Sequence, residues 1–143
     1  NLVQEAALEW APRAVANHQD FGLHVIAADL FLNADPMRLR EMLDNLLDNA
    51  LRYSPAGGQI SVSLIKAKTI RIRVEDSATI ILASERERIF ERFYRIPGTR
   101  QDGSGLGLAI VKDIASLHGA ILRVGPREGG QGNCFEVCFP IER

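Results

Sequence analysis

The amino-acid sequence contains only 2 cysteines among 143 residues, both within the stretch NCFEVCFP. This stretch is predicted to be a strand, and the even spacing of Cys134 and Cys138 places their side chains on one face. A disulfide between neighbours on one strand would be strained, and no further Cys or His follows at metal-ligand spacing. We therefore expect two reduced, packed thiols, as in a cytosolic protein.

Long apolar runs and an excess of one charge are also missing. No run approaches the roughly 18 apolar residues of a membrane span, and no charged-then-apolar signal segment opens the chain. The 17 basic and 18 acidic residues give a net charge of -1, which argues against a nucleic-acid partner. The remaining composition, 46% hydrophobic and 24% charged, is typical of a soluble globular protein, and the length suits a single domain over residues 1–143.

The first half of the chain predicts two helices and short strands between them. A helix is expected over residues 2–17, bent or interrupted at Pro12, followed by strands at 23–26 and 30–33. The clearest helix begins with Asp35 as N-cap and Pro36 in its first turn. Its broad apolar face consists of Met37, Leu39, Met42, Leu43, Leu46, Leu47, Ala50 and Leu51. Pro55 and the glycines at 57–58 end it.

The second half predicts hairpins and two further helices. Strands at 59–65 and 70–76 form a hairpin, and Ser84 with Glu87 forms a capping box for a short helix over 84–93. A polar loop at 94–104 precedes a helix at 106–117, with Gly119 at its C′ position. Strands at 121–124 and 134–140 complete the chain. Hairpins outnumber βαβ units, so we expect an α+β fold, with helices layered on a mixed sheet.

Two asparagines on the long helix form the first candidate site. Asn45 and Asn49 are four residues apart and share one face, with Asp48 beside them and Arg52 one turn further. Asn is a poor helix former, so this pair requires a reason. An amide oxygen can bind Mg²⁺, and Arg52 can contact a phosphate. The alternative is a polar face exposed to solvent.

Alternating glycines form the second candidate site. Gly103, Gly105 and Gly107 precede an amphipathic helix, where free backbone N–H groups bind phosphate well. The stretch is not a Walker loop, because it lacks the Lys-Ser/Thr pair. It is not a dinucleotide fingerprint, because Leu108 stands where Gly is needed. The alternative is a flexible linker.

Two further stretches are more ambiguous alone. Asp76 ends a strand in VEDSATII, where it can accept a hydrogen bond from an exocyclic amine or simply face solvent. In ERIFERFYR, Phe90 and Phe93 are expected to pack in the core. Arg92 and Arg95 in the same stretch either reach phosphates or remain exposed.

The order of these stretches resembles the catalytic, ATP-binding domain of bacterial sensor histidine kinases, a superfamily shared with Hsp90, MutL and gyrase B. NLLDNALRYSP is similar to the N box, RIFERFYR to the F box and GSGLGLAIVKDIASLHG to the second glycine box. GGQGNCFEVCFP is similar to the closing Gly-x-Gly-Thr stretch, with Asn133 where Thr is usual. The resemblance covers essentially the whole chain.

The resemblance implies a two-layer α/β sandwich of about five strands under three helices, with an ATP lid at about residues 94–105. Asn49 would hold Mg²⁺, and Asp76 would accept the adenine amino group. The other positions implied to bind ATP are Asn45, Arg52, Tyr53, Ala78, Ile80, Arg92, Arg95, Gly103, Gly105, Leu106, Gly107 and Leu108.

The resemblance also implies a phosphotransfer domain rather than an ATPase. The hydrolysing relatives carry a Glu where this chain has Asn45, and an amide cannot act as a general base. None of the three histidines, His18, His24 and His118, lies in a His-Glu-x-x-x-Pro stretch. The phosphoacceptor would be a His on a separate dimerisation domain, and a response regulator receiver domain would follow. We expect a monomeric cytoplasmic fragment of an inner-membrane protein, without direct membrane contact and unable to phosphorylate itself.

One stretch departs from the family pattern. Asp-x-Gly-x-Gly is usual after this strand, and here Ala78 and Ile80 replace the glycines. Ile80 is β-branched and would be costly at positive φ. Two hypotheses follow. The domain is either a kinase module with an altered pocket rim, or a degenerate module that binds ATP weakly or not at all and acts through protein contacts.

Overall fold

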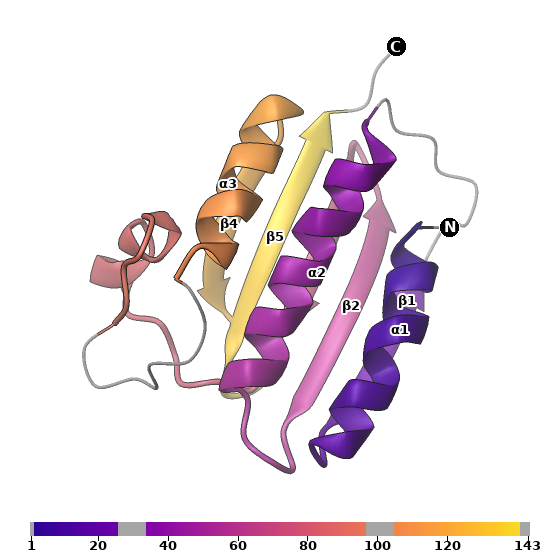
Figure 1. The fold of residues 1–143 in the computed structure, drawn as a ribbon, viewed down its shortest axis with the longest axis vertical. Helices are drawn as coiled ribbons and strands as arrows, with labels where there is room; N and C mark the ends of the chain where they lie inside the picture. The colour runs from indigo at the N-terminus through magenta and orange to yellow at the C-terminus, as the bar shows by residue number, and fades with distance from the viewer. Residues whose placement is uncertain (1, 26–33, 97–104, 141–143) are drawn as a thin grey trace.

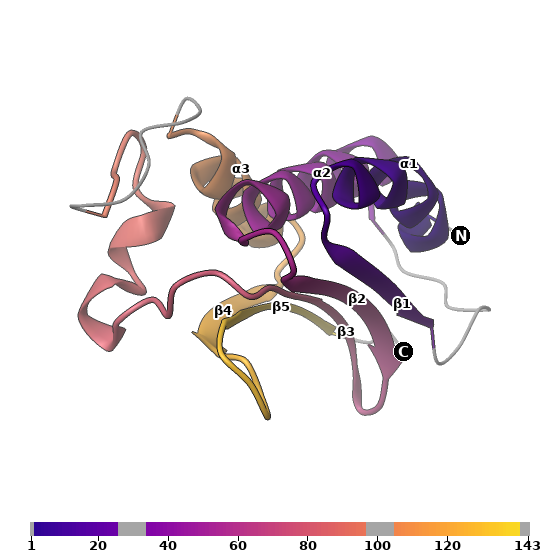
Figure 2. The ribbon, with the colours of Figure 1, turned by 90° about the horizontal axis from the view of Figure 1, so that it is seen from below.

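The computed structural model describes residues 2–25, 34–96 and 105–140. They form a five-stranded sheet with strand order β1-β2-β3-β5-β4. Three helices cover one face of this sheet, as Figures 1 and 2 show, and the described segment after β3, residues 76–96, projects beyond the sheet. The predicted α+β sandwich is confirmed.

Neighbouring strands of the sheet are antiparallel except at one edge, where β1 pairs in parallel with β2. β2 (Gln59–Lys66) and β3 (Thr69–Glu75) are antiparallel neighbours, as predicted. β5 (Asn133–Pro140) lies antiparallel to both β3 and β4 (Ile121–Pro126). β1 (Asp20–Val25) pairs with β2 in parallel and begins three residues before the predicted strand. The candidate strand at 30–33 lies outside the described residues.

The core lies between the sheet and the helices. Alternate residues of β2, β3 and β5 are buried, which is the pattern of a sheet covered on one face. α2 (Pro36–Tyr53) contributes most of the predicted apolar face. Met37 is the exception, with 81% of its surface exposed. It stands four residues before the exposed Glu41, so it belongs to the polar face of the helix.

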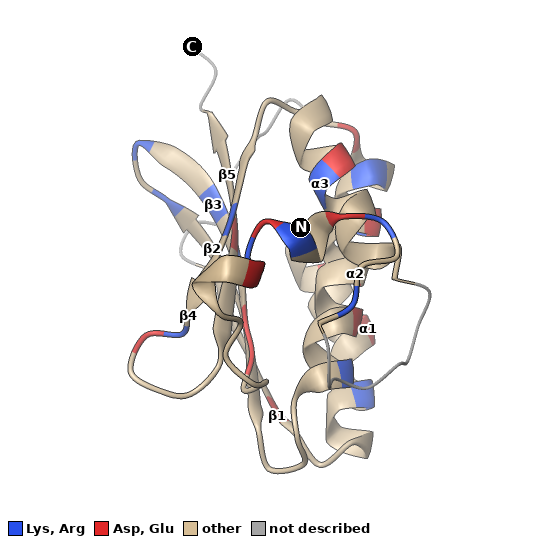
Figure 3. Ribbon diagram, turned by 90° about the vertical axis from the view of Figure 1, so that its left-hand side faces the viewer, with Lys and Arg blue, Asp and Glu red and all other residues tan. Residues whose placement is uncertain are grey.

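The outer face of the sheet carries the two cysteines. Both are unpaired and half-buried, as predicted. Burial, reinforced by the negative charge of Glu75, raises the pKa of Cys134 to about 11. The thiol of Cys134 is therefore protonated at neutral pH. Acidic and basic residues occur on both layers of the fold (Figure 3), in agreement with the balanced charge of the sequence.

α1 (Leu2–Ala16) is not interrupted at Pro12, one of the two outcomes that the sequence suggested, because the helix continues through this residue. Proline cannot donate to the carbonyl one turn earlier, which belongs to Leu8. Leu8 and Pro12 are both exposed, so water can hydrate that carbonyl. On its other side the helix packs against α2, where Trp10 Nε1 donates to Asp44 Oδ1 over 2.7 Å.

The segment after β3 is not the single capped helix that the sequence predicts. It forms two short 3₁₀ helices, η1 (Ala83–Glu85) and η2 (Arg88–Phe90). Ser84 lies inside η1 rather than before it, and neither helix has a side-chain cap. The hydroxyl of Tyr94 donates to Glu85 instead, which holds the two ends of this segment together.

The beginning of α2 is linked to the end of α3 (Gly107–Leu117). Asp35 caps α2 as predicted, because its Oδ1 accepts from the N–H groups of Met37 and Arg38. The backbone N–H of Asp35 donates to Nε2 of His118 over 3.1 Å. Gly119 follows at a φ of 65°, the predicted C′ position.

We expect Asp35→Ala to lower the free energy of unfolding by about 1 kcal/mol, because two helical N–H groups lose their acceptor. Asp35→Asn keeps an oxygen at the cap and should stay within about 0.5 kcal/mol of the parent. Urea unfolding of the three proteins checks this. An Asn variant as unstable as the Ala variant would contradict the capping role.

Candidate functional site

Asp76 lies immediately beyond the end of β3 and is almost fully buried, with 1% of its surface exposed. Its Oδ1 accepts from the N–H of Ala78 at 3.0 Å and from the N–H of Asn133 at 3.1 Å. Asn133 Nδ2 lies 3.5 Å from the same oxygen. Oδ2 has no hydrogen-bond partner in the part of the chain that the structure describes. One carboxylate oxygen is therefore fixed, and the other is available to a donor.

The environment of Asp76 opposes its ionisation. Burial raises the pKa of this carboxyl group above the ordinary value of 3.8. The N–H donors of Ala78 and Asn133 act in the opposite direction, and so does the positive charge of Arg127. A buried carboxylate that keeps a free oxygen is costly, and such groups concentrate at functional sites.

Two residues at the start of β5 position Asp76, and the sequence did not identify them as site residues. Gly132 has a φ of 140°, and a Cβ there would lie 1.8 Å from the carbonyl oxygen of Asp76. Asn133 accepts the Asp76 N–H on its carbonyl oxygen at 2.9 Å. The signal in the sequence was the polar Asn133 at the first, inward-facing position of a strand whose alternate residues are buried.

The stretch that lacks the family glycines follows a path free of left-handed strain. Among described residues other than glycine, only His18 and Phe93 have positive φ, so neither Ala78 nor Ile80 is strained. Ala78 is buried, and its N–H belongs to the turn that Asp76 Oδ1 closes. Ile80 has 44% of its surface exposed. It does not fill the core beside Asp76.

The polar face of α2 extends from Asp76 towards α3. At its C-terminal end, Ser54 Oγ accepts the N–H of Ser77 at 3.1 Å. Asn49 and Tyr53 are half-buried, and their side chains have no hydrogen bond to a described residue. At the other end, Asn45 Nδ2 donates to the carbonyl of Glu41. From Asn45 to Tyr53, the last residue of α2, the helix rises by about 12 Å.

The start of α3 lies against this same face of α2. A Cβ at Gly107 would lie 3.2 Å from Asn45 Oδ1, so the missing side chain allows the close approach. Leu106 is the N-cap residue and makes no side-chain cap, and Leu108 packs at the edge of the core. Among the described residues, no side chain caps the backbone N–H groups at this helix start, and such a helix start suits an anion.

Gly105 closes the base of the loop that precedes α3. Its carbonyl accepts the N–H of Phe93 at 2.8 Å, and a Cβ on Gly105 would lie 3.0 Å from the Phe93 Cα. The φ of Gly105 is 75°, which suits glycine. Residues 97–104, with Gly103, lie outside the described residues.

The three candidate arginines differ in their ion-pair partners and in their exposure. Arg52 is paired with Asp48 on α2 at 3.0 Å. Arg92 lies 3.7 Å from Asp113, well beyond the first turn of α3, and both side chains are largely exposed. Arg95 is half-buried near the base of the loop.

The two phenylalanines of ERIFERFYR behave differently from each other. Phe90 is buried and meets Phe135 edge-on, with ring centroids 6.3 Å apart. Phe93 has 69% of its surface exposed, so the expectation that it packs in the core was wrong. The spacing of three assumed a helix through both residues, whereas η2 ends at Phe90 and Phe93 has a φ of 63°.

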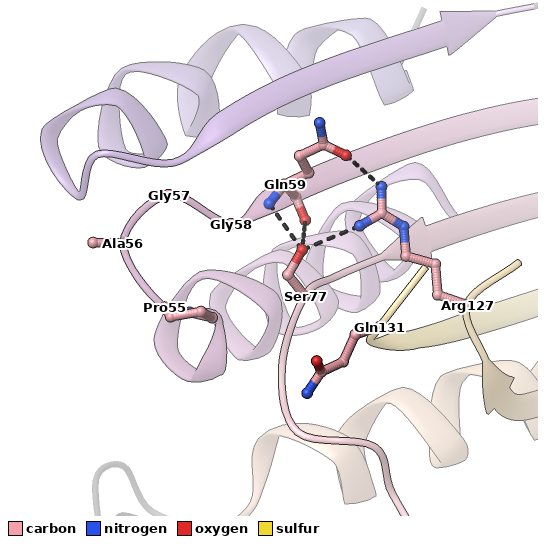
Figure 4. Close-up of a pocket in the computed structure, with 8 residues that line it drawn as sticks. All are labelled: Pro55, Ala56, Gly57, Gly58, Gln59, Ser77, Arg127 and Gln131. Carbon is pink, nitrogen blue, oxygen red and sulfur yellow. Dashed lines mark hydrogen bonds between the residues drawn. The ribbon is translucent and has the colours of Figure 1, made fainter. Parts of the chain in front are cut away.

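A shallow pocket of about 460 Å³ lies beside Ser77 (Figure 4), and Asp76 is not among the residues that line it. Ser77 Oγ accepts from the Gln59 N–H and from Arg127 Nη1, and it donates to the Gln59 carbonyl. Arg127 Nη2 donates to Gln59 Oε1. The polar groups of Gln59, Ser77 and Arg127 are thus hydrogen-bonded to one another. These bonds hold Ser77, the residue after Asp76, in place.

Taken together, the site combines a buried acceptor, two amide side chains and an uncapped helix start along one face of α2. The acceptor at one end suits an amine of a flat base, and the helix start at the other suits an anionic group. Among the described residues, no cluster of three His, Cys, Asp or Glu could hold a metal ion by itself. No helix in the described ranges is long and apolar enough to cross a membrane.

Curated relatives of this chain are sensor proteins of bacteria. The sensor protein kinase PmrB of Pseudomonas aeruginosa is 37% identical over 146 residues, covering 97% of this chain and 29% of the relative. The swarming motility regulation sensor protein RssA of Serratia marcescens is 40% identical over 114 residues, covering 78% and 24%. The chain thus spans less than a third of the length of these relatives.

Solved structures share the fold over nearly the whole chain. The mycobacterial sensor histidine kinase MprB has a TM-score of 0.85 and 30% identity, covering 97% of this chain and 93% of that one. Full-length ShkA in complex with AMPPNP has a TM-score of 0.82, also at 30% identity, covering 97% and 29%. ThkA in complex with the response regulator TrrA has a TM-score of 0.80 at 26% identity, covering 97% and 39%.

The family model that matches is the histidine kinase-, DNA gyrase B-, and HSP90-like ATPase, over residues 34–143. This range contains α2, Asp76, the start of α3 and Asn133, which are the parts that build the site. The chain belongs to this ATPase family and corresponds to the ATP-binding catalytic domain of its sensor histidine kinases.

Proposed function

We propose that this domain binds Mg·ATP along the polar face of α2 and supplies the γ-phosphate to a histidine on a separate dimerisation domain. The observation that carries the proposal is the free Oδ2 of the buried Asp76, whose other oxygen is held by Ala78 and Asn133. Adenine has an exocyclic amine donor where guanine has a carbonyl acceptor. A fixed carboxylate oxygen therefore selects adenine.

The phosphate end of the nucleotide would lie near the start of α3. Asn49 has an amide with no hydrogen-bond partner among described residues, so its oxygen is free to hold Mg²⁺. Mg²⁺ characteristically takes few protein ligands together with phosphate oxygens, which agrees with a single amide rather than a cluster. The backbone at Gly105, Leu106 and Gly107 would bind the phosphates, with Tyr53 and Arg52 beside the nucleotide. Roles for Gly103, Leu108, Arg92 and Arg95 stay predictions.

Transfer to a protein histidine agrees better with the site than hydrolysis does. Asn45 occupies the position from which a carboxylate would activate water, and its amide donates to the Glu41 carbonyl. His118 is already occupied: Nε2 accepts from Asp35, and Nδ1 lies 2.8 Å from the Ile114 carbonyl. None of the three histidines of this chain lies in a His-Glu-x-x-x-Pro stretch. We therefore propose that the phosphoacceptor belongs to another domain and that a response regulator is the recipient. A cytoplasmic location follows from this role.

The degenerate alternative depends on Ala78 and Ile80. Neither residue blocks Asp76: Ala78 supplies one of its hydrogen bonds, and the Ile80 side chain is partly in solvent. We therefore favour ATP binding, and calorimetric titration of this domain with Mg·ATP separates the two readings. No detectable binding at millimolar nucleotide would favour the degenerate module.

We expect Asp76→Asn to weaken Mg·ATP binding about 10- to 100-fold, the effect of losing a hydrogen bond to a charged acceptor. The preference for ATP over GTP should shrink with it. Glu75→Gln is the matched control, because Glu75 is the neighbouring acid on the outer face of the sheet. Isothermal titration calorimetry measures all three proteins. Unchanged ATP affinity in Asp76→Asn would exclude adenine recognition by Asp76.

The same substitution should change stability in the opposite direction. Because burial raises the pKa of Asp76, the folded protein binds this proton more tightly than the unfolded chain. The stability gained from the proton is present below the ordinary pKa and is lost as pH rises through the raised pKa. Asp76→Asn should therefore gain stability relative to the parent between acid and neutral pH. Urea unfolding across this range checks the sign, and a relative loss would contradict it.

Gly132→Ala should lower the free energy of unfolding by about 2–4 kcal/mol and reduce ATP affinity, because a Cβ cannot fit against the Asp76 carbonyl. Gly130→Ala is the control in the same turn. A Cβ at Gly130 would meet nothing within 4 Å, and its effect should stay within about 0.5 kcal/mol. Thermal unfolding and calorimetry provide both readouts. Equal effects of the two substitutions would disprove the close-approach role.

A further inference from the structure

The carboxamide of Asn133 holds the stretch in which the family glycines are missing. Its Oδ1 accepts the N–H of Ile81 at 2.8 Å, and its Nδ2 donates to the carbonyl of Thr79 at 2.9 Å. These two backbone groups flank Ile80. The same side chain also lies against Asp76 Oδ1, and its own backbone pairs with Asp76 in both directions. Asn133 is itself buried.

This pairing suits an extended residue at position 80. In an extended chain, the carbonyl before a residue and the N–H after it point to the same side. A side-chain amide offers one acceptor and one donor side by side, as the backbone of a neighbouring strand does. A threonine hydroxyl carries its donor and its acceptor on one atom of a shorter side chain, so we expect that it does not reach these two groups on either side of Ile80.

The side chain at position 80 fits the conformation that Asn133 imposes. Ile80 is β-branched and favours extended backbone, whereas glycine favours neither strand nor helix. Thr79 and Ile81 are held by Asn133, and Ile80 between them keeps 44% of its surface exposed. Ala78 lies two residues before Ile80, and its N–H is one of the donors that fix Asp76 Oδ1.

We propose that Asn133 is a positioning residue for nucleotide binding, and that it acts together with Ala78 and Ile80. The amide replaces the conformational role of the two absent glycines: it fixes residues 79–81 in an extended course, which keeps Oδ2 of Asp76 open to the base. This inference rests on the proposed ATP binding. It adds that Asn133, Ala78 and Ile80 form one coupled unit, so that the loss caused by replacing Asn133 depends on the residues at positions 78 and 80.

The test is a double-mutant cycle on this domain. Its corners are the parent, Asn133→Thr, the pair Ala78→Gly/Ile80→Gly, and the triple variant. Asn133→Thr alone should weaken Mg·ATP binding about 10-fold or more, because the backbone at Thr79 and Ile81 loses both partners. The triple variant should recover to within about 3-fold of the pair. Gln131→Thr, at an exposed position two residues earlier, is the matched control and should leave binding unchanged.

Amide hydrogen exchange in the nucleotide-free protein gives a second readout that general destabilisation would not mimic. The Ile81 amide should exchange at least about 10-fold faster in Asn133→Thr, while core amides such as that of Val137 keep their protection. If Asn133→Thr does not fold, the pair and the triple variant are compared directly. Thr should then be tolerated in the glycine background, and an equally severe loss there would overturn the proposal.

The outcomes separate this inference from the proposed function. A parent domain that binds no Mg·ATP overturns both. A parent that binds, together with an Asn133→Thr variant of equal affinity, overturns only the role of Asn133. A triple variant no better than Asn133→Thr overturns the coupling with positions 78 and 80. Recovery in the triple variant, with fast exchange at Ile81 in the single variant, supports the whole unit.

Discussion

The interaction on which the site depends is the set of N–H bonds to one oxygen of Asp76. Ala78 and Asn133 direct three N–H groups at Oδ1, two from the backbone at 3.0 and 3.1 Å and one from a side chain at 3.5 Å. These bonds make it possible to bury a carboxylate, which would otherwise cost several kcal/mol. They also leave Oδ2 in a fixed direction. The recognition of a base amine that we propose for this position would therefore be a consequence of how the fold offsets the burial of a charge.

The rest of the fold serves to bring these donors together. β5 lies beside β3, so the residue that begins β5 faces the residue that follows β3. Gly132 allows this contact at backbone distance. On the other side, Ser77 forms hydrogen bonds with Ser54 at the end of α2 and with Gln59 and Arg127. The acid and the residue after it are thus held from the sheet and from the helix layer.

Much of this arrangement could be predicted from local patterns. The cap at Asp35, the amphipathic face of α2 and the alternating strands follow rules of short range, and the structure agrees. Phe93, Met37 and the two 3₁₀ helices were missed because their environment depends on where a helix stops or turns away from the core. Asn133 was missed for a different reason. Its partners are more than 50 residues away in the sequence, and no local pattern indicates them.

Asn133 also explains how a motif can lose its glycines while Asp76 keeps its surroundings. Glycine in such a stretch allows the backbone to adopt the required conformation because it lacks a side chain. In this chain, the carboxamide of Asn133 holds the backbone in place by hydrogen bonds on both sides of Ile80. A β-branched residue, which favours extended backbone, then suits position 80. The constraint comes from the same residue that donates to Asp76 Oδ1. The residues that differ from the family pattern at positions 78, 80 and 133 therefore have one common effect: together they hold the segment after β3 that carries Asp76.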